Sequence, residues 1–537
     1  MRSLDIQLYQ VCEDLTELLI YLMVLFSPWA FGTSQHWSIW VMNSGGYCLG
    51  AMLLAKLAIR RLKDYHPPRW DDGQKSEVRS PKSEVSGQWS VVSGQPSVVS
   101  GQPSVVHGPW SVVRGQPPAT ASRLTALLAG LTVAILGYCL VSALNARATC
   151  DPATLSFDYH DNYVHWLPHS FDSRRTWFAF WSCLGLAFSF WAMRDWLLGK
   201  SAAEARAERQ TTGPGGKARA AFFPVRLRRL FWLLAINGGL LGVEGIVQRL
   251  EGSGKLLFLV RPRIHQTADT QFGPYAYYAN AAQYFNLLWP ACLGFWWTLR
   301  RARQFGGHGH RLVLLCCAIM AACPVISTSR GGALITVGML VLSTLYLAAT
   351  QVRFGPHRHD GARKRMILLA VLALFFTGAL ALGFSLGWKA LKPRLVTIHE
   401  GFQSREAMYD AFRPMARDYP VFGTGPGTWE TVSDLYRIST EAEWWAQLHN
   451  DWLETRITFG WVGSAFIALA LVTVLLRWFA SGGIRAGRRF VLLTWLGLGG
   501  CLVHARFDFP FQMHSIVFLF LLLCAVLFTL SRRPSVR

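Results

Sequence analysis

Hydrophobic residues along this chain gather in long runs that are separated by polar segments. A run of roughly 17–25 apolar residues is long enough to cross the hydrocarbon core of a membrane as an α-helix. The pattern therefore predicts an all-α, polytopic integral membrane protein with about twelve transmembrane helices. The predicted spans lie at about 15–33, 37–59, 123–144, 176–198, 230–248, 277–299, 312–328, 331–350, 367–387, 457–476, 490–504 and 513–531.

The polar segments divide the chain into regions. Residues 1–74 hold the first two predicted spans, 119–387 the third to ninth, and 457–537 the last three. Between the first two regions, residues 75–118 carry a seven-residue repeat in which paired valines stand beside Gly, Ser, Gln and Pro. Since Gly and Pro break helices and this composition cannot form a core, we predict a disordered cytoplasmic insert. A partner-binding tether is the alternative for this repeat. Residues 388–456 form one large extracytoplasmic loop.

Composition and charge support a membrane protein. Of 537 residues, 52% are hydrophobic and 16% are charged, and a soluble chain would carry more charge. The net charge of +22 raises the possibility of nucleic-acid binding. With a cytoplasmic N-terminus, however, 36 of the 53 Lys and Arg residues fall on the inner side, which is the positive-inside pattern. This topology explains the basic charge without nucleic acid, and it places both termini in the cytoplasm.

The large loop has features of an ordered structure. Within it, "SREAMYDAFRPMARDYP" places Ala407, Ala411 and Met415 at helical spacing, which predicts a short amphipathic helix that Pro420 ends. The following "GTGPGTW" predicts a glycine-rich turn. Just before the next span, "AEWWAQLHNDWLETR" brings His449 to the outer surface of the membrane.

Three arginines on the outer side are candidates for binding an anion. Arg330, in "STSRGG", links two spans with almost no loop, and its guanidinium suits the bidentate binding of phosphate oxygens. A snorkelling arginine that reaches lipid headgroups is the alternative. Arg405 and Arg413 lie eight residues apart, which predicts a shared helix face; either they bind the same anion or they are solvated charges.

His449 is a candidate general base, because histidine titrates near neutrality and can accept a proton from a hydroxyl. We expect Asp451 or Glu454 to orient its ring, and a structural histidine is the alternative. Asn450 is a candidate substrate ligand or a helix cap. The side chains of Trp429, Trp444 and Trp445 are expected either to stack on a flat face of a substrate or to anchor the loop at the membrane interface. Arg506 and Asp508 are expected to pair structurally.

The outer loops carry no metal-binding signature such as CxxC, HExxH or paired aspartates. We therefore predict no metal and no cofactor. If the outer arginines bind a phosphate-containing ligand, they rather than a metal would supply the positive charge.

Three segments resemble the O-antigen ligase family, which includes O-antigen polymerases and related protein O-oligosaccharyltransferases. Arg330 in "TSRGG", Arg405 in "SREAMYDAFRPMARDYPVFGTGPGTW" and His449 in "HNDWLETRITFGWVG" follow the family's order and approximate spacing. The segments "FSPWAFG" and "FGPYAYYANAAQYFNLLWPACLG" are also similar to this group. Family members more often read Asn-Arg-Asn-His where this chain has Tyr-Tyr-Ala-Asn, so only Asn280 matches there.

The resemblance implies a multi-helical, GT-C-like and metal-independent glycosyltransferase that uses an undecaprenyl-diphosphate-linked glycan. Arg330 and Arg405 match the family's two arginines thought to hold the diphosphate, and His449 matches the histidine proposed to activate the acceptor hydroxyl. The expected location is the bacterial inner (plasma) membrane, among membrane lipids, with the active site facing the periplasm.

Three functions compete at this point. A ligase would move a finished glycan to lipid A-core or a similar acceptor, whereas a polymerase would join lipid-linked repeat units. A non-enzymatic transporter is the alternative of another class, and Glu244 in the fifth predicted span leaves it open. Transporters usually place ionisable residues at mid-membrane, whereas the candidates here cluster on the outer side, which favours an enzyme.

Overall fold

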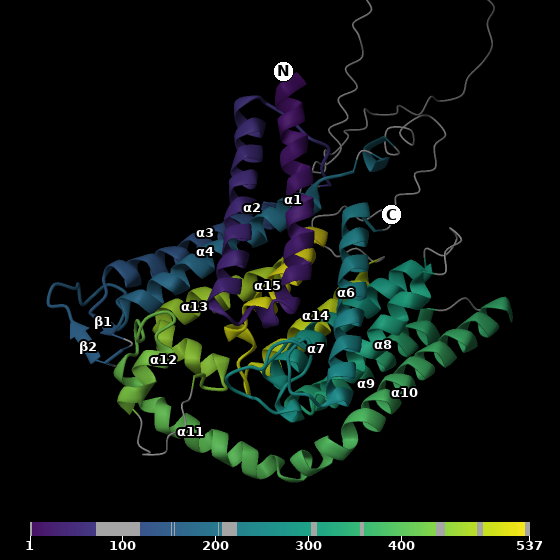
Figure 1. Ribbon diagram of the computed structural model, residues 1–537. Helices are drawn as coiled ribbons and strands as arrows, with labels where there is room; N and C mark the ends of the chain where they lie inside the picture. Colours follow the sequence, from purple (N-terminus) through teal and green to yellow (C-terminus); the bar gives the residue numbers. More distant parts are fainter. Residues whose placement is uncertain are drawn as a thin grey trace, which may run out of the picture.

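The computed structural model describes residues 3–70, 119–151, 153–154, 156–201, 203–206, 223–301, 309–354, 359–436, 446–480 and 487–531. The predicted repeat insert, residues 75–118, therefore lies outside the described residues, as do Trp444 and Trp445. Within the described part the chain is mostly helical, and each predicted span coincides with a helix (Figure 1). The long helices are α1 (Ser3–Trp29), α2 (His36–Leu62), α3 (Ala119–Leu144), α4 (Ser173–Leu198), α6 (Val225–Glu251), α7 (Tyr278–Arg301), α8 (His310–Ile326), α9 (Arg330–Phe354), α10 (His359–Val396), α11 (Ile398–Asp418), α13 (Asp451–Ala480), α14 (Arg488–His504) and α15 (His514–Leu530).

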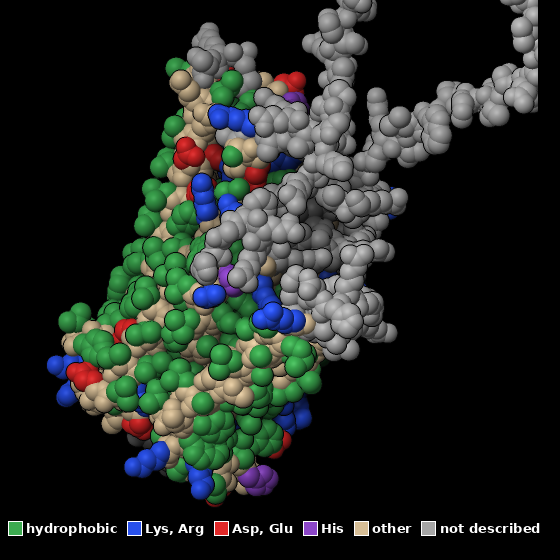
Figure 2. Space-filling view, turned by 90° about the vertical axis from the view of Figure 1, so that its right-hand side faces the viewer, with side chains coloured by type: hydrophobic (Ala, Val, Ile, Leu, Met, Phe, Trp, Pro, Cys, Tyr) green, Lys and Arg blue, Asp and Glu red, His purple; other side chains and the backbone are tan. Residues whose placement is uncertain are grey.

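Length and apolar composition identify a membrane protein. Among the described residues, α3, α4, α6, α9, α10 and α13 each contain a segment long and apolar enough to cross a bilayer, and α8 and α15 are shorter apolar helices. The protein is thus an integral membrane protein, while the full count of twelve spans stays a prediction. Figure 2 shows the matching surface: hydrophobic side chains cover most of the described face in that view, and charged side chains gather mainly toward its ends.

Helix α7 forms the centre of the bundle. Almost all of its side chains are buried, and it packs against α6, α8, α9, α14 and α15.

The turn before α7 also contacts the hairpin formed by α1 and α2. Between α1 and α2, Gly32 has φ of +64°, and a Cβ atom there would lie 2.5 Å from Cε1 of Tyr275. Only glycine fits at this position of the turn. The segment "FSPWAFG", which ends at Gly32, therefore packs against the segment that contains Tyr275.

Helices α1 and α2, which stand side by side in Figure 1, are joined to the bundle by buried charges. Lys56 is fully buried, and its ammonium group lies 2.9 Å from Glu13 and 3.2 Å from Asp195. Asp195 also binds Arg60 and Arg69, and Glu13 binds Arg226. A buried ammonium needs such partners because desolvation of an unpaired charge is costly.

The predicted large loop has helical structure over much of its length, and the helix before it is longer than predicted. Helix α10 does not end near residue 387 but continues to Val396, and Figure 1 shows α10 and α11 curving together along one side of the molecule. Helix α11 confirms the predicted amphipathic helix. Its buried side chains are Met408, Tyr409, Phe412 and Met415, whereas Ala407 of the expected face is exposed.

The buried face of α11 packs in a small lobe outside the helical bundle. The lobe comprises residues 145–172 and 398–436, with the short helix α12 (Trp429–Val432) and the 3-10 helix η4 (Ser433–Tyr436). It also contains an antiparallel hairpin, β1 (Ala148–Asp151) with β2 (Ser156–Tyr159), which the all-α prediction missed. These strands are only four residues long, too short for their pattern to stand out in the sequence.

The glycine-rich turn, residues 423–429, packs against a point where helix α13 is interrupted. Gly423 and Gly425 have φ of +67° and +111°, and Gly460 interrupts α13 with φ of +61° and ψ of −166°. Backbone hydrogen bonds join the two segments, including Thr424 N–H to the Ile457 carbonyl at 2.9 Å. A Cβ on Gly460 would lie 2.2 Å from the Val421 oxygen, so glycine is required for this close approach.

Candidate active site

His449 and Asp508 form the centre of the candidate site. His449 immediately precedes the capped start of α13, and Asp508 lies in the loop between α14 and α15. Nδ1 of His449 lies 2.9 Å from Oδ1 of Asp508, and the carboxylate is 3% exposed whereas the imidazole is 24% exposed. Because Asp508 engages Nδ1, Nε2 is the ring nitrogen through which His449 can exchange a proton with a ligand.

The surrounding residues fix the position of His449. Its backbone has φ of +54°, an uncommon conformation for a non-glycine residue that the local structure must hold. The hydroxyl of Tyr409 donates a 2.7 Å hydrogen bond to the His449 carbonyl. The imidazole meets the rings of Tyr277 and Phe509 edge-on, with centroids 6.0 and 4.8 Å away. Tyr277 and Phe509 also stack on each other, so together they form one aromatic wall beside the imidazole.

Arg405 approaches the same pair from α11. Its guanidinium donates to the carbonyl oxygen of Phe507, the residue before Asp508. Burial alone would raise the pKa of the Asp508 carboxyl, but the hydrogen bond and charge of His449, together with the charge of Arg405, hold that pKa below its usual range. Asp508 is thus a carboxylate at neutral pH.

Arg330 stands at the first residue of α9, directly after the turn that follows α8. Its two Nη atoms donate long hydrogen bonds of 3.5 and 3.3 Å to the carbonyl and hydroxyl of Thr397. A Cβ added at Gly401 would lie 2.0 Å from Nη1, so the guanidinium passes directly over this glycine. The next residue, Gly331, packs against the ring of His504, whose Nε2 lies 4.0 Å from Asp508. Contacts therefore connect Arg330 to the His449–Asp508 pair.

Two predictions about the pairing of charges were wrong. Neither Asp451 nor Glu454 orients the imidazole. Asp451 accepts hydrogen bonds from Phe511 N–H and the Gln512 amide and so fixes the α14–α15 loop, while Glu454 accepts Leu448 N–H. Asp508 bonds to His449, whereas the guanidinium of Arg506 lies over the rings of Tyr409 and Phe507.

The predicted binding residues occupy different environments. The Asn450 amide oxygen accepts Leu453 N–H at 3.2 Å, which is the predicted helix cap. Asn280 is buried in the first turn of α7, and its amide oxygen has no hydrogen-bond partner among the described residues. A role in substrate binding stays a prediction for both.

Arg413 and Trp429 do not join the His449 group in the ways predicted. Eight residues advance an α-helix by about 800°, or about 80° beyond two full turns, so Arg405 and Arg413 do not share a face. Arg413 instead pairs with Asp410 on the exposed side of α11. Trp429 is 2% exposed and packs against Phe412 in the lobe, so its ring has no open face for a sugar. Trp444 and Trp445 lie outside the described residues.

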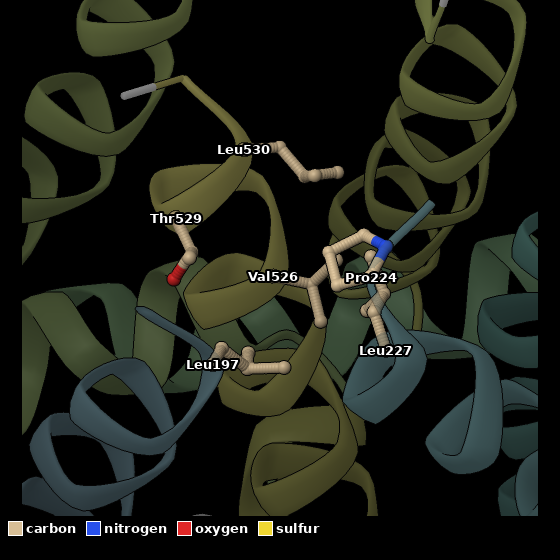
Figure 3. Close-up of a pocket in the computed structure, with 6 residues that line it drawn as sticks. All are labelled: Leu197, Pro224, Leu227, Val526, Thr529 and Leu530. Atoms are coloured by element: carbon tan, nitrogen blue, oxygen red, sulfur yellow. The ribbon is translucent and has the colours of Figure 1, made fainter. Parts of the chain in front are cut away.

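A small cleft elsewhere among the described residues has few polar groups. It lies between the ends of α4, α6 and α15 (Figure 3). Its lining is apolar apart from one hydroxyl, and it lies at the end of α15 opposite to Asp508. Among the described residues no group of three or more His, Cys, Asp or Glu side chains gathers as a metal site would require.

Part of the chain matches a known protein family. Residues 315–468 match the family model described as O-antigen ligase, and this stretch contains Arg330, Arg405 and His449. No curated protein matches the chain.

Proposed function

We propose that this integral membrane protein, whose residues 315–468 carry an O-antigen ligase domain, transfers a glycan from undecaprenyl diphosphate to an acceptor hydroxyl. The reaction would take place on the extracytoplasmic face, at the periplasmic side of the bacterial inner membrane. The charge distribution supports this orientation, because the side with fewer Lys and Arg residues is the one on which His449 lies.

The observation that carries the proposal is the 2.9 Å contact between His449 and Asp508 beside Arg405. A buried carboxylate on Nδ1 fixes the tautomer and orientation of an imidazole and stabilises the imidazolium that forms when it accepts a proton. In our mechanism, Nε2 of His449 takes the proton of the acceptor hydroxyl as its oxygen attacks the anomeric carbon. Direct displacement would invert the configuration at that carbon.

The leaving group explains the two arginines. As the new glycosidic bond forms, the bond between the anomeric carbon and the phosphate oxygen breaks, and undecaprenyl diphosphate departs with its electron pair. Arg330 and Arg405 would bind the phosphate oxygens and stabilise the charge that develops on them. The long hydrogen bonds of Arg330 to Thr397 support this role, since a phosphate oxygen would be a stronger acceptor than a hydroxyl.

The acceptor distinguishes a ligase from a polymerase. A ligase uses lipid A-core or a similar acceptor, whereas a polymerase uses a second lipid-linked repeat. The experiment therefore offers each acceptor separately to the purified protein, with a polyprenyl-diphosphate-linked glycan from the producing cells as donor. We expect transfer to one of them, and the acceptor used identifies the subtype.

The same assay tests the residues. We expect Arg330→Ala, Arg405→Ala and His449→Ala each to lose most transfer, with chelator present in every reaction to test metal independence. The control is Arg417→Ala, which removes a cation near the end of α11. Full transfer by His449→Ala would remove the histidine from the chemistry, and loss of wild-type transfer in chelator would overturn the metal-free mechanism.

A further inference from the structure

We propose that Arg394 is a third arginine of the diphosphate-binding site, where it exchanges its ion pair with Asp269 for the phosphate of the lipid-linked donor. This inference rests on the proposed function and extends it to a residue of α10. It also gives Asp269 a role, as the carboxylate that holds the guanidinium until the donor binds.

The continuation of α10 brings Arg394 to the site. Because the helix runs on through Pro393 to Val396, Arg394 lies in its last turn, close to the start of α11. The Thr397 hydroxyl donates to the Arg394 carbonyl at 3.4 Å and also receives the 3.3 Å hydrogen bond from Arg330. The residues Arg330 and Arg394 are therefore linked through a single threonine.

Aromatic contacts connect Arg394 to His449 on the other side. The guanidinium carbon lies 4.7 Å from the ring centroid of Tyr278. The rings of Tyr278 and Tyr277 are 4.9 Å apart, and Tyr277 meets His449 edge-on. These contacts connect Arg394 with Arg330 through Thr397 and with His449 through two tyrosines, and our proposal places the diphosphate among these three residues.

The ion pair between Arg394 and Asp269 is suited to exchange. Its N–O distance is 3.3 Å, and the two side chains are 25% and 62% exposed. Exposed pairs of this kind contribute little stability, because water and salt screen both charges. The diphosphate of the donor carries two negative charges where Asp269 carries one, and its oxygens can accept two parallel hydrogen bonds from a guanidinium, so it would displace Asp269.

The Asp269 carboxyl is ionised before the donor binds. A hydrogen bond from Thr267, together with the nearby Arg394 and Arg249 charges, holds the pKa of the Asp269 carboxyl below its usual range. Arg249 itself donates to the carbonyl oxygens of Ala268 and Ser327, at 2.8 and 2.9 Å. Arg249 thereby fixes the Asp269 turn against the residues that lead into Arg330.

The test measures binding of undecaprenyl diphosphate without a glycan to the purified full-length protein in lipid nanodiscs. We expect Arg394→Ala to weaken binding by about tenfold or more, as loss of a charge-assisted contact does. Lys392→Ala is the matched control, since this exposed cation lies two residues away on the same helix and should bind like the wild type. Arg394→Lys should recover only part of the affinity, because an ammonium cannot form the two parallel hydrogen bonds.

Asp269→Asn provides the second measurement and keeps the proposal testable if Arg394→Ala does not fold. Removing the competing carboxylate should tighten binding of undecaprenyl diphosphate, and unchanged or weaker binding would overturn the exchange. In transfer assays, Arg394→Ala should raise KM for the donor more than it lowers kcat.

Arg330→Ala separates this inference from the proposed function. Suppose that wild type binds undecaprenyl diphosphate and Arg330→Ala does not. Equal binding by Arg394→Ala and wild type would then exclude Arg394 from the diphosphate-binding site and leave the proposed function standing. If the wild-type protein does not bind it, the proposed donor is wrong, and the inference fails with it.

Discussion

Replacing Asp508 by asparagine tests whether the His449–Asp508 pair is catalytic or structural. Asparagine keeps the size and one oxygen of the side chain but removes the negative charge. If the carboxylate stabilises the imidazolium of His449 during proton transfer, transfer must slow even when the protein folds normally.

The expected size follows from the geometry. The contact is 2.9 Å long and Asp508 is almost fully buried, so little water screens the pair. A hydrogen bond to a charged group contributes about 1.5–3 kcal/mol. If this contribution acts in the transition state, kcat/KM should fall by about 10- to 150-fold. Removal of the base itself in His449→Ala should cost roughly 100- to 10,000-fold.

The assay is transfer of glycan from lipid diphosphate to the acceptor, measured for wild type, both single variants and the double variant. Because Asp508 acts through His449, Asp508→Asn should have no further effect once His449 is alanine. Asp410→Asn, which removes an exposed carboxylate from α11, is the control and should keep wild-type activity. The reasoning would be refuted if Asp508→Asn lowered kcat/KM by the same factor with His449 present and with His449 replaced by alanine. It would also be refuted if the Asp508→Asn single variant kept activity within twofold of wild type.

Three further predictions concern the donor site and stability. Gly401→Ala should displace the Arg330 guanidinium and raise KM for the donor by about tenfold, whereas Gly378→Ala, where a methyl group meets nothing within 4 Å, should not. The depressed pKa of Asp508 stabilises the fold above its unfolded pKa of about 3.9, and this contribution is lost as pH falls through the folded pKa. The difference in thermal midpoint between wild type and Asp508→Asn should therefore shrink between about pH 6 and about pH 3, and a constant difference would contradict this. Lys56→Met leaves the buried Asp195 and the partly buried Glu13 with fewer cations and should lower the free energy of unfolding by about 3 kcal/mol, whereas exposed Lys63→Met should have little effect in the same denaturant titration.

The helices could be predicted because membrane insertion demands long apolar runs, and such runs are visible without any knowledge of contacts. The amphipathic α11 and the glycine turn were also predictable, since their signals are local. The end of α10 was not: Lys389, Lys392 and Arg394 are polar, so hydropathy suggested a loop although the backbone continues as a helix.

The pairing of Asp508 could not be read from neighbouring residues. His449 and Asp508 are 59 positions apart, and the local pattern favoured Arg506 as the partner of Asp508 and either Asp451 or Glu454 as that of His449. One signal did exist, since "HARFDFPFQMH" is a short outer loop on the predicted membrane face of His449. A buried acid in such a loop is a candidate partner, but the choice among three carboxylates depends on how α13, α14 and α15 pack.

The same separation has a consequence for biosynthesis. During translation, Arg330, Arg405 and His449 are all synthesised before Asp508, and α15 must follow before the α14–α15 loop closes on α13. If the proposed function holds, a nascent chain presents its arginines to lipid-linked donors while its base still lacks the carboxylate. In our mechanism, activity begins only when insertion of the last hairpin is complete, so unfinished chains in the membrane would not consume the donor.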